Sequence, residues 1–201
     1  MILMLNCSYK VKDSNTQYFL ELLQKELATE ETQIIPIRQV LNDGFTDFVK
    51  KLQHAEAFVL GAPLYVDGLP AQAVRLLEML LEGEYSGLSG KRVYVVSNLG
   101  FYEAEQICNL FDIVHNWCDR MKMIYGGGLS VGAGPMISTL KSMPLKKGLN
   151  KDIGMGLEVL ADNIRKAESM ENYYAKTRIP RVVYLQAAHM MFRQTMKENG
   201  Q

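Results

Sequence analysis

Residues 1–24, MILMLNCSYKVKDSNTQYFLELLQ, decide the fold of this chain. Residues 2–5 form a short apolar run that fits a strand covered on both faces. A polar stretch follows from Asn6 to Thr16. Apolar residues then recur at helical spacing, at Phe19, Leu20, Leu22, Leu23 and Leu27. The order strand, polar loop, helix places the loop at a helix start, where backbone N–H groups lack intrahelical partners.

The polar loop can serve the helix start in two ways. Unpaired N–H groups and the partial positive charge of a helix N-terminus bind anions, and a phosphate is the obvious candidate. Alternatively, Ser14 or Asn15 is only an N-cap, which stabilises the helix by about 1 kcal/mol and needs no ligand. This stretch alone leaves both interpretations open.

Length and charge restrict the class of protein. A chain of 201 residues predicts one domain with room for an extension. The 22 basic and 22 acidic residues give a formal net charge of zero, so no long-range field favours nucleic acid or an anionic membrane surface. No apolar run approaches the roughly 20 residues of a membrane span, and the first residues do not resemble a signal peptide. We expect no membrane and no nucleic-acid partner.

The cysteines and histidines show no metal-site pattern. Three cysteines without a CxxC pair favour a reducing cytoplasm. Cys108 and Cys118 stand in apolar helical contexts, so we expect small buried thiols. His54, His115 and His189 have no carboxylate or cysteine at metal-ligand spacing, which favours structural or surface roles. We therefore predict no metal site.

Strand and helix patterns alternate along the chain. Further strands are expected at 33–37, 56–62, 92–97 and 123–131, and helices near 45–52, 71–81, 103–118 and 150–168. Strands separated by helices of about ten to fifteen residues indicate βαβ crossovers. The sequence thus predicts an α/β fold, a doubly wound, five-stranded, open parallel sheet with helices on both faces.

The C-terminal segment departs from this alternation. We divide the chain into a domain at 1–170 and a helical extension at 171–201, in which Pro180 can start a helix. The extension carries a sparse apolar face, made by Val183, Leu185, Ala187, Met190, Met191 and Met196. That face covers a partner subunit or the sheet edge, or packs on its own domain.

Two more loops are expected at the carboxyl ends of strands, where open α/β sheets bind ligands. GAPLYVDGLPAQ at 61–72 combines two prolines with Tyr65. The prolines hold the backbone N–H and C=O groups at fixed positions, where they can hydrogen-bond the edges of a planar heterocycle. SNLGFYEAEQ at 97–106 brings Asn98, Gly100 and Phe101 before a helix. Each loop could also be an unliganded turn. Their convergence with the phosphate-like loop favours a mononucleotide with a flat ring system.

The glycine-rich stretch at 126–135 does not predict a dinucleotide site. A dinucleotide fingerprint needs its glycines directly between a strand and the following helix, and a polar stretch intervenes here. We expect these glycines to let the last strand pass close to a neighbouring loop or to the ligand.

The segments NCSYKVKDSNT, APLYVDGLP and NLGFYEAEQ, in this order and spacing, resemble the three flavin-contacting loops of the flavodoxin-like NAD(P)H-dependent FMN reductase and flavin oxidoreductase family. The resemblance covers roughly residues 1–135. It implies a flavodoxin-like fold, bound FMN, and NAD(P)H as co-substrate. The FMN-binding residues that it implies are Ser8, Lys10, Ser14, Asn15, Thr16, Pro63, Leu64, Tyr65, Val66, Asp67, Asn98, Gly100, Phe101 and Glu103.

The resemblance assigns these residues by loop. The hydroxyls and amides of the first loop hold the phosphate, with Lys10 as a charge partner. The second loop lines the isoalloxazine ring and the ribityl chain, and the third borders the ring. Tyr65 and Phe101 are the expected gatekeepers at the exposed ring face. The chain departs from the family pattern at Cys7 and Tyr9, where glycine and proline are common, and at Ala62, where a hydroxyl residue is frequent.

The resemblance implies that the flavin carries the chemistry and that no side chain acts as nucleophile or general base. Our leading hypothesis is an FMN-dependent oxidoreductase that passes hydride from NAD(P)H to a quinone, a free flavin or another small acceptor. We expect a homodimer, from the base rate of such oligomers and from the apolar face of the C-terminal segment. The alternatives are an electron carrier of flavodoxin type, which the neutral charge disfavours, and a flavin-binding sensor without turnover.

Overall fold

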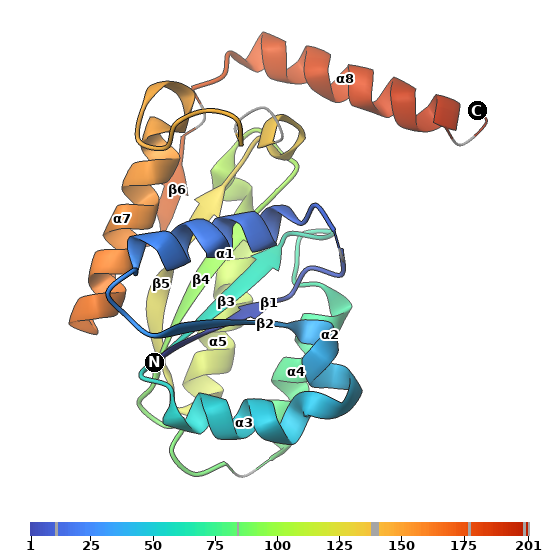
Figure 1. The fold of residues 1–201 in the computed structure, drawn as a ribbon. Helices are drawn as coiled ribbons and strands as arrows, with labels where there is room; N and C mark the ends of the chain where they lie inside the picture. Colours follow the sequence, from blue (N-terminus) through green and yellow to red (C-terminus); the bar gives the residue numbers. More distant parts are fainter. Residues whose placement is uncertain (11, 84, 138–140, 177, 199, 201) are drawn as a thin grey trace.

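The computed structural model describes residues 1–10, 12–83, 85–137, 141–176, 178–198 and 200 (Figure 1). Its strands form one sheet in the order β2-β1-β3-β4-β5-β6, and all neighbouring pairs are parallel. The strands are β1 (Ile2–Asn6), β2 (Thr32–Pro36), β3 (Ala57–Pro63), β4 (Arg92–Asn98), β5 (Ile124–Val131) and β6 (Tyr173–Ala175).

Helices connect successive strands. The α-helices of the described chain are α1 (Asn15–Glu26), α2 (Ile37–Gln39), α3 (Phe45–His54), α4 (Ala71–Glu82), α5 (Cys108–Met121), α7 (Lys151–Lys166) and α8 (Arg181–Glu198). A π-helical segment, Val40–Gly44, joins α2 to α3, and 3₁₀ turns lie at Ala104–Ile107, Gly134–Met136 and Gly148–Asn150. The order of β1 to β5 is that of the flavodoxin-like fold, so the predicted fold class is confirmed.

The sheet has one strand more than the five expected. β6 pairs with the end of β5, through Leu129–Tyr173, Ser130–Tyr174 and Val131–Ala175. It lies inside the segment that the sequence predicts as a helical extension. A three-residue strand is too short to produce a recognisable alternation of apolar and polar residues, and it becomes a strand only because the edge of β5 is available.

Alternate residues of the strands pack into two hydrophobic cores, one on each face of the sheet. Ile2 and Met4 pack with α1 and α7 on one face, whereas Leu3 and Leu5 pack with α3, α4 and α5 on the other. Both sets of side chains are buried, which explains why β1 is a continuous apolar run rather than an alternating one. The helix layers leave the carboxyl ends of β1, β3 and β4 open to the loops that follow them.

The glycines of β5 permit close packing, as expected. A Cβ on Gly128 would lie 2.6 Å from the Phe111 ring, and one on Gly127 would lie 2.5 Å from the Met170 carbonyl oxygen. Gly127 also has a φ of 103°, which L-residues rarely adopt.

One expectation about side-chain burial was wrong, and the alternatives for the apolar face of the C-terminal helix are reduced. Cys118 is buried, but Cys108 is exposed, because it is the first residue of α5 and faces away from the core. On α8, Val183, Leu185 and Met190 are exposed, and Tyr184 instead is buried against the body. The side chain of Met191 lies outside the described set. Within the described chain, none of the helices has the length and apolar character needed to cross a bilayer.

Candidate functional site

The three loops singled out in the sequence meet at one edge of the sheet. β1 lies between β2 and β3, so the connections leaving β1 and β3 run in opposite directions along the sheet. Such a reversal opens a crevice outside the carboxyl ends of the strands. Asn6, Pro63 and Asn98 are the last residues of β1, β3 and β4, and each begins one of the loops.

Asn6 organises the first loop. Its side chain is almost completely buried; its Oδ1 accepts a hydrogen bond from the backbone N–H of Ser8 at 2.9 Å, and its Nδ2 donates to Gln17 Oε1 at 2.8 Å. Because one amide holds both the loop and the first turn of α1, the loop has a fixed shape. Asn6 was not among the expected site residues, although its signal is visible in the sequence: a polar residue at the end of an otherwise apolar strand.

Ser14 is the N-cap of α1. Its Oγ accepts a hydrogen bond from the backbone N–H of Gln17 at 3.1 Å. Its carbonyl oxygen accepts one from the backbone N–H of Tyr18, also at 3.1 Å. Ser14 is thus an N-cap, and this does not exclude an anion at the same helix start. The N–H groups of Asn15 and Thr16 have no hydrogen-bond partner among the described residues, so the cap leaves two amides of the helix start available to an anion.

A cavity of about 260 Å³ opens beside these amides. It is bounded by the first loop, by the start of α1, and by the second and third loops. The expected site residues that line it are Ser8, Lys10, Asn15, Thr16, Pro63, Leu64, Tyr65, Asn98 and Gly100. Leu99 and Gly134 complete the lining and were not expected. This cavity therefore brings together members of all three loops.

Buried hydrogen bonds connect the loops around this cavity. Thr16 Oγ1 donates to Asn98 Oδ1 at 2.9 Å, which ties α1 to the third loop. The backbone N–H of Leu64 donates to the Asn98 carbonyl oxygen at 2.9 Å, which ties the second loop to the third. Asn98 is thus a junction for the site, and its side chain is almost completely buried.

A second cavity, of about 710 Å³, adjoins the first and shares Leu64, Tyr65 and Gly100 with it. We call it the aromatic cleft. Five of its lining residues are aromatic: Tyr9, Tyr65, Phe101, Tyr184 and Phe192. Val66 and Ala188 complete it. Tyr65, Val66 and Phe101 were expected near a flavin ring. Tyr9 and the residues of α8 were not, because no local pattern shows where that helix lies.

The second loop carries strain at its tip. Val66 and Asp67 both have positive φ, 46° and 59°, between Tyr65 and Gly68, whose backbones exchange two hydrogen bonds of 3.0 Å. Positive φ is costly for a β-branched residue such as valine. Burial, and then the neighbouring Tyr9, raise the pKa of Tyr65, whose ring lies 5.6 Å from that of Tyr9.

Some expected residues lie outside both cavities. Asp67 is exposed at the loop tip. Glu103 forms an ion pair with Arg181 of α8, with an Nη2–Oε1 distance of 3.3 Å. Ser14 faces a third cavity, of about 420 Å³, on the β2 side of the first loop.

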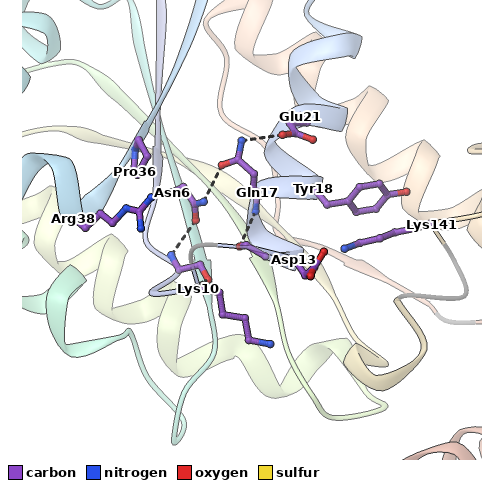
Figure 2. A pocket seen from close by; sticks show the side chains of 11 residues that line it. Asn6, Lys10, Asp13, Gln17, Tyr18, Glu21, Pro36, Arg38 and Lys141 are labelled. Atoms are coloured by element: carbon purple, nitrogen blue, oxygen red, sulfur yellow. Dashed lines mark hydrogen bonds between the residues drawn. The ribbon is translucent and has the colours of Figure 1, made fainter.

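Figure 2 shows this third cavity, which shares Ser8 and Lys10 with the first. Arg38 and Lys141 approach it from opposite sides, and the Lys141 ammonium lies 5.1 Å from the centre of the Tyr18 ring. The hydrogen-bonded series from Asn6 through Gln17 to Glu21 forms one wall. It is a mixed-charge surface, because Asp13 also lines it.

The residues present fit FMN. Two free amides at a helix start, the Ser8 hydroxyl and the Lys10 ammonium suit a phosphate dianion. A Cβ on Gly100 would meet nothing within 4 Å, so a flat ring can approach the third loop closely. The adjoining aromatic cleft supplies apolar surface for such a ring.

Comparisons with known proteins agree with this arrangement. The family model described as NADPH-dependent FMN reductase matches residues 1–129. None of the curated proteins compared matches the chain.

Solved structures share the fold at low sequence identity. An apo NADH:FMN oxidoreductase is 15% identical, and the match covers 90% of this chain and 97% of the oxidoreductase chain, with a TM-score of 0.60. An NADPH-quinone reductase from P. pentosaceus is 20% identical, covering 81% and 94%, with a TM-score of 0.56. A general stress protein 14 from Treponema denticola, in complex with FMN, is 10% identical, covering 83% and 99%, with a TM-score of 0.59. From the family match over most of its length, the chain belongs to the NADPH-dependent FMN reductase family and is an oxidoreductase of the flavodoxin-like fold.

Proposed function

We propose that this protein passes hydride from NADPH or NADH, through bound FMN, to a small acceptor such as a quinone or a free flavin. The observation that carries the proposal is the junction of two unlike cavities at the reversal point of the sheet. One begins at a helix start and has a mixed polar and apolar lining; the other is mostly aromatic and open. A phosphorylated cofactor with a flat ring matches that pair.

The residues of the chain would bind and orient the cofactor. Ser8, Lys10 and the N–H groups of Asn15 and Thr16 would hold the phosphate, while Pro63 and Leu64 would border the ring. FMN, when bound, supplies the capacity to take up and give up hydride. Tyr65 and Phe101 would stack at the open ring face and limit which molecules reach it.

We further propose a cytoplasmic homodimer. Cys7 and Cys118 are buried thiols without a disulfide, and burial raises the pKa of the Cys118 thiol to about 12. Protonated buried thiols suit a reducing compartment. The exposed apolar side chains of α8, including Val182 and Met190, support a second copy as the neighbour of that helix.

The direct test is an absorption spectrum. The protein is incubated with FMN, desalted, and then mixed with NADPH or NADH without oxygen. We expect retained yellow colour that bleaches within seconds. Retained colour that does not bleach would support the electron-carrier or sensor alternatives, and a colourless protein would exclude a flavin site.

A further inference from the structure

The aromatic cleft is made by residues from four separate parts of the chain, and one of them is the C-terminal helix. Tyr184, Ala188 and Phe192 lie four residues apart on α8, so they share one face of that helix, and all three line the cleft. The other walls come from the first, second and third loops. Figure 1 shows α8 crossing above the end of the sheet, with its last turns extending away from the body.

The start of α8 is fixed to the third loop by several contacts. The Tyr184 hydroxyl donates to the Gly100 carbonyl oxygen, and the Tyr102 hydroxyl donates to the Ile179 carbonyl oxygen at 2.7 Å. The rings of Tyr102 and Tyr184 lie 5.3 Å apart. With the ion pair between Glu103 and Arg181, these contacts make the first turns of the helix a positioned wall.

The described lining of the cleft contains no charged side chain. Lys10 lines the other two cavities instead, and Arg181 is paired with Glu103. A planar neutral molecule gains apolar and ring contacts in such a cleft, whereas a phosphate placed there loses water without gaining a partner.

We propose that α8 determines acceptor specificity, with Phe192 as its specificity-determining residue, and that the cleft selects planar uncharged aromatic acceptors over the same ring systems carrying phosphate. This inference rests on the proposed function. In the reaction tested, NADPH, one proton and riboflavin yield NADP⁺ and dihydroriboflavin. Two electrons move as hydride through the bound flavin, and the proton comes from solvent.

Riboflavin and FMN are the matched acceptors, because they share one ring and differ by the phosphate. With the FMN-loaded protein, freed of excess FMN, the kcat/KM for each added flavin is measured without oxygen at one NADPH concentration. We expect riboflavin to exceed FMN by about tenfold, because the phosphate is desolvated without compensation. Equal values, or a preference for FMN, would overturn the proposal.

Phe192→Lys tests the role of the helix directly. Phe192 is 74% exposed, so the substitution leaves the core intact. A cation in the cleft should reduce the riboflavin preference to about one, because it gives the phosphate a partner. Gln186→Lys is the matched control: Gln186 is exposed on the same helix and does not line the cleft. A similar change of preference in both variants would contradict the assignment to Phe192.

Binding provides a readout independent of turnover. Titration calorimetry of riboflavin into the oxidised, FMN-loaded protein should show weaker binding for Phe192→Ala than for wild type and for Gln186→Ala. Unchanged affinity in Phe192→Ala would exclude α8 as the acceptor wall. Failure of the proposed function is distinguishable, since the protein would then not retain FMN or would not bleach with NADPH.

Discussion

The first cavity and the aromatic cleft lie side by side but are built differently. The part of the first cavity proposed to hold the phosphate, which we call the polar cradle, comes from one stretch, residues 6–17, whose polar groups are held by hydrogen bonds between near neighbours in sequence. The cleft is assembled from side chains as distant as Tyr9 and Phe192, and its wall on α8 depends on a few tertiary contacts. A local sequence thus defines the proposed phosphate site, and the tertiary structure defines the proposed acceptor site.

The largest expected effect comes from breaking the junction between α1 and the third loop. Thr16→Val keeps the side-chain shape but removes the donor to Asn98, and a buried acceptor without a partner costs about 2 kcal/mol. We expect the free energy of unfolding in urea to fall by that amount and FMN affinity to fall with it. Thr46→Val, at an exposed position on α3, is the control and should change neither.

The next largest effect is expected on FMN affinity when the cation of the polar cradle, Lys10, is removed. Lys10→Ala should weaken FMN binding by about tenfold, since a charge-assisted contact with phosphate is lost, and should leave riboflavin binding to the same site unchanged. Affinities are measured by flavin fluorescence quenching on the cofactor-free protein. Lys12→Ala removes a nearby exposed cation and should weaken FMN binding less. An equal loss of both flavins in Lys10→Ala would mean that Lys10 does not contact the phosphate.

A smaller effect of opposite sign is expected at the strained tip of the second loop. Asparagine tolerates positive φ better than valine, so Val66→Asn should raise the free energy of unfolding by about 1 kcal/mol. Val182→Asn, at an exposed position on α8, lacks this strain and should not stabilise the protein. If Val66→Asn proves destabilising, the turn at residues 65–68 differs from the one described.

The smallest effect concerns the anchor of α8. Tyr184→Phe removes the hydroxyl that donates to Gly100, an exposed residue whose carbonyl can turn to water, so the loss should be about 0.5 kcal/mol. Tyr85→Phe is the control, because its hydroxyl has no hydrogen bond within the described chain.

The same residue predicts a pH dependence. Burial, and then the Glu103 carboxylate, raise the pKa of Tyr184, so the folded state favours the protonated phenol. Its contribution is complete below the ordinary tyrosine pKa of about 10 and is lost as pH rises through the higher folded-state pKa. Urea unfolding from pH 8 to 11 should therefore show a shallower alkaline decline for Tyr184→Phe than for wild type. If the two proteins lose stability equally as the pH rises, Tyr184 does not contribute to the alkaline loss of stability.

Much of the fold and part of the site could be predicted from the sequence. The strand, loop and helix of residues 1–26 follow from apolar runs and polar spacing, and Ser14 is where a capping residue is expected. The exposure of Cys108 and the strand β6 could not be predicted, because each depends on what lies beside it in space. The same holds for Asn6, whose partners Ser8 and Gln17 are near in sequence but are brought together only by the turn of the loop.

The sequence by itself determined the alternating α/β order, the position of the polar loop at a helix start, and the two loops that follow β3 and β4. These are local properties, set by the spacing of side chains along a few turns or strand residues. The tertiary structure alone decided that α8 closes the aromatic cleft and that Asn98 joins the loops. Those contacts join residues separated by tens of positions, and their free energy appears only once the sheet has placed them side by side.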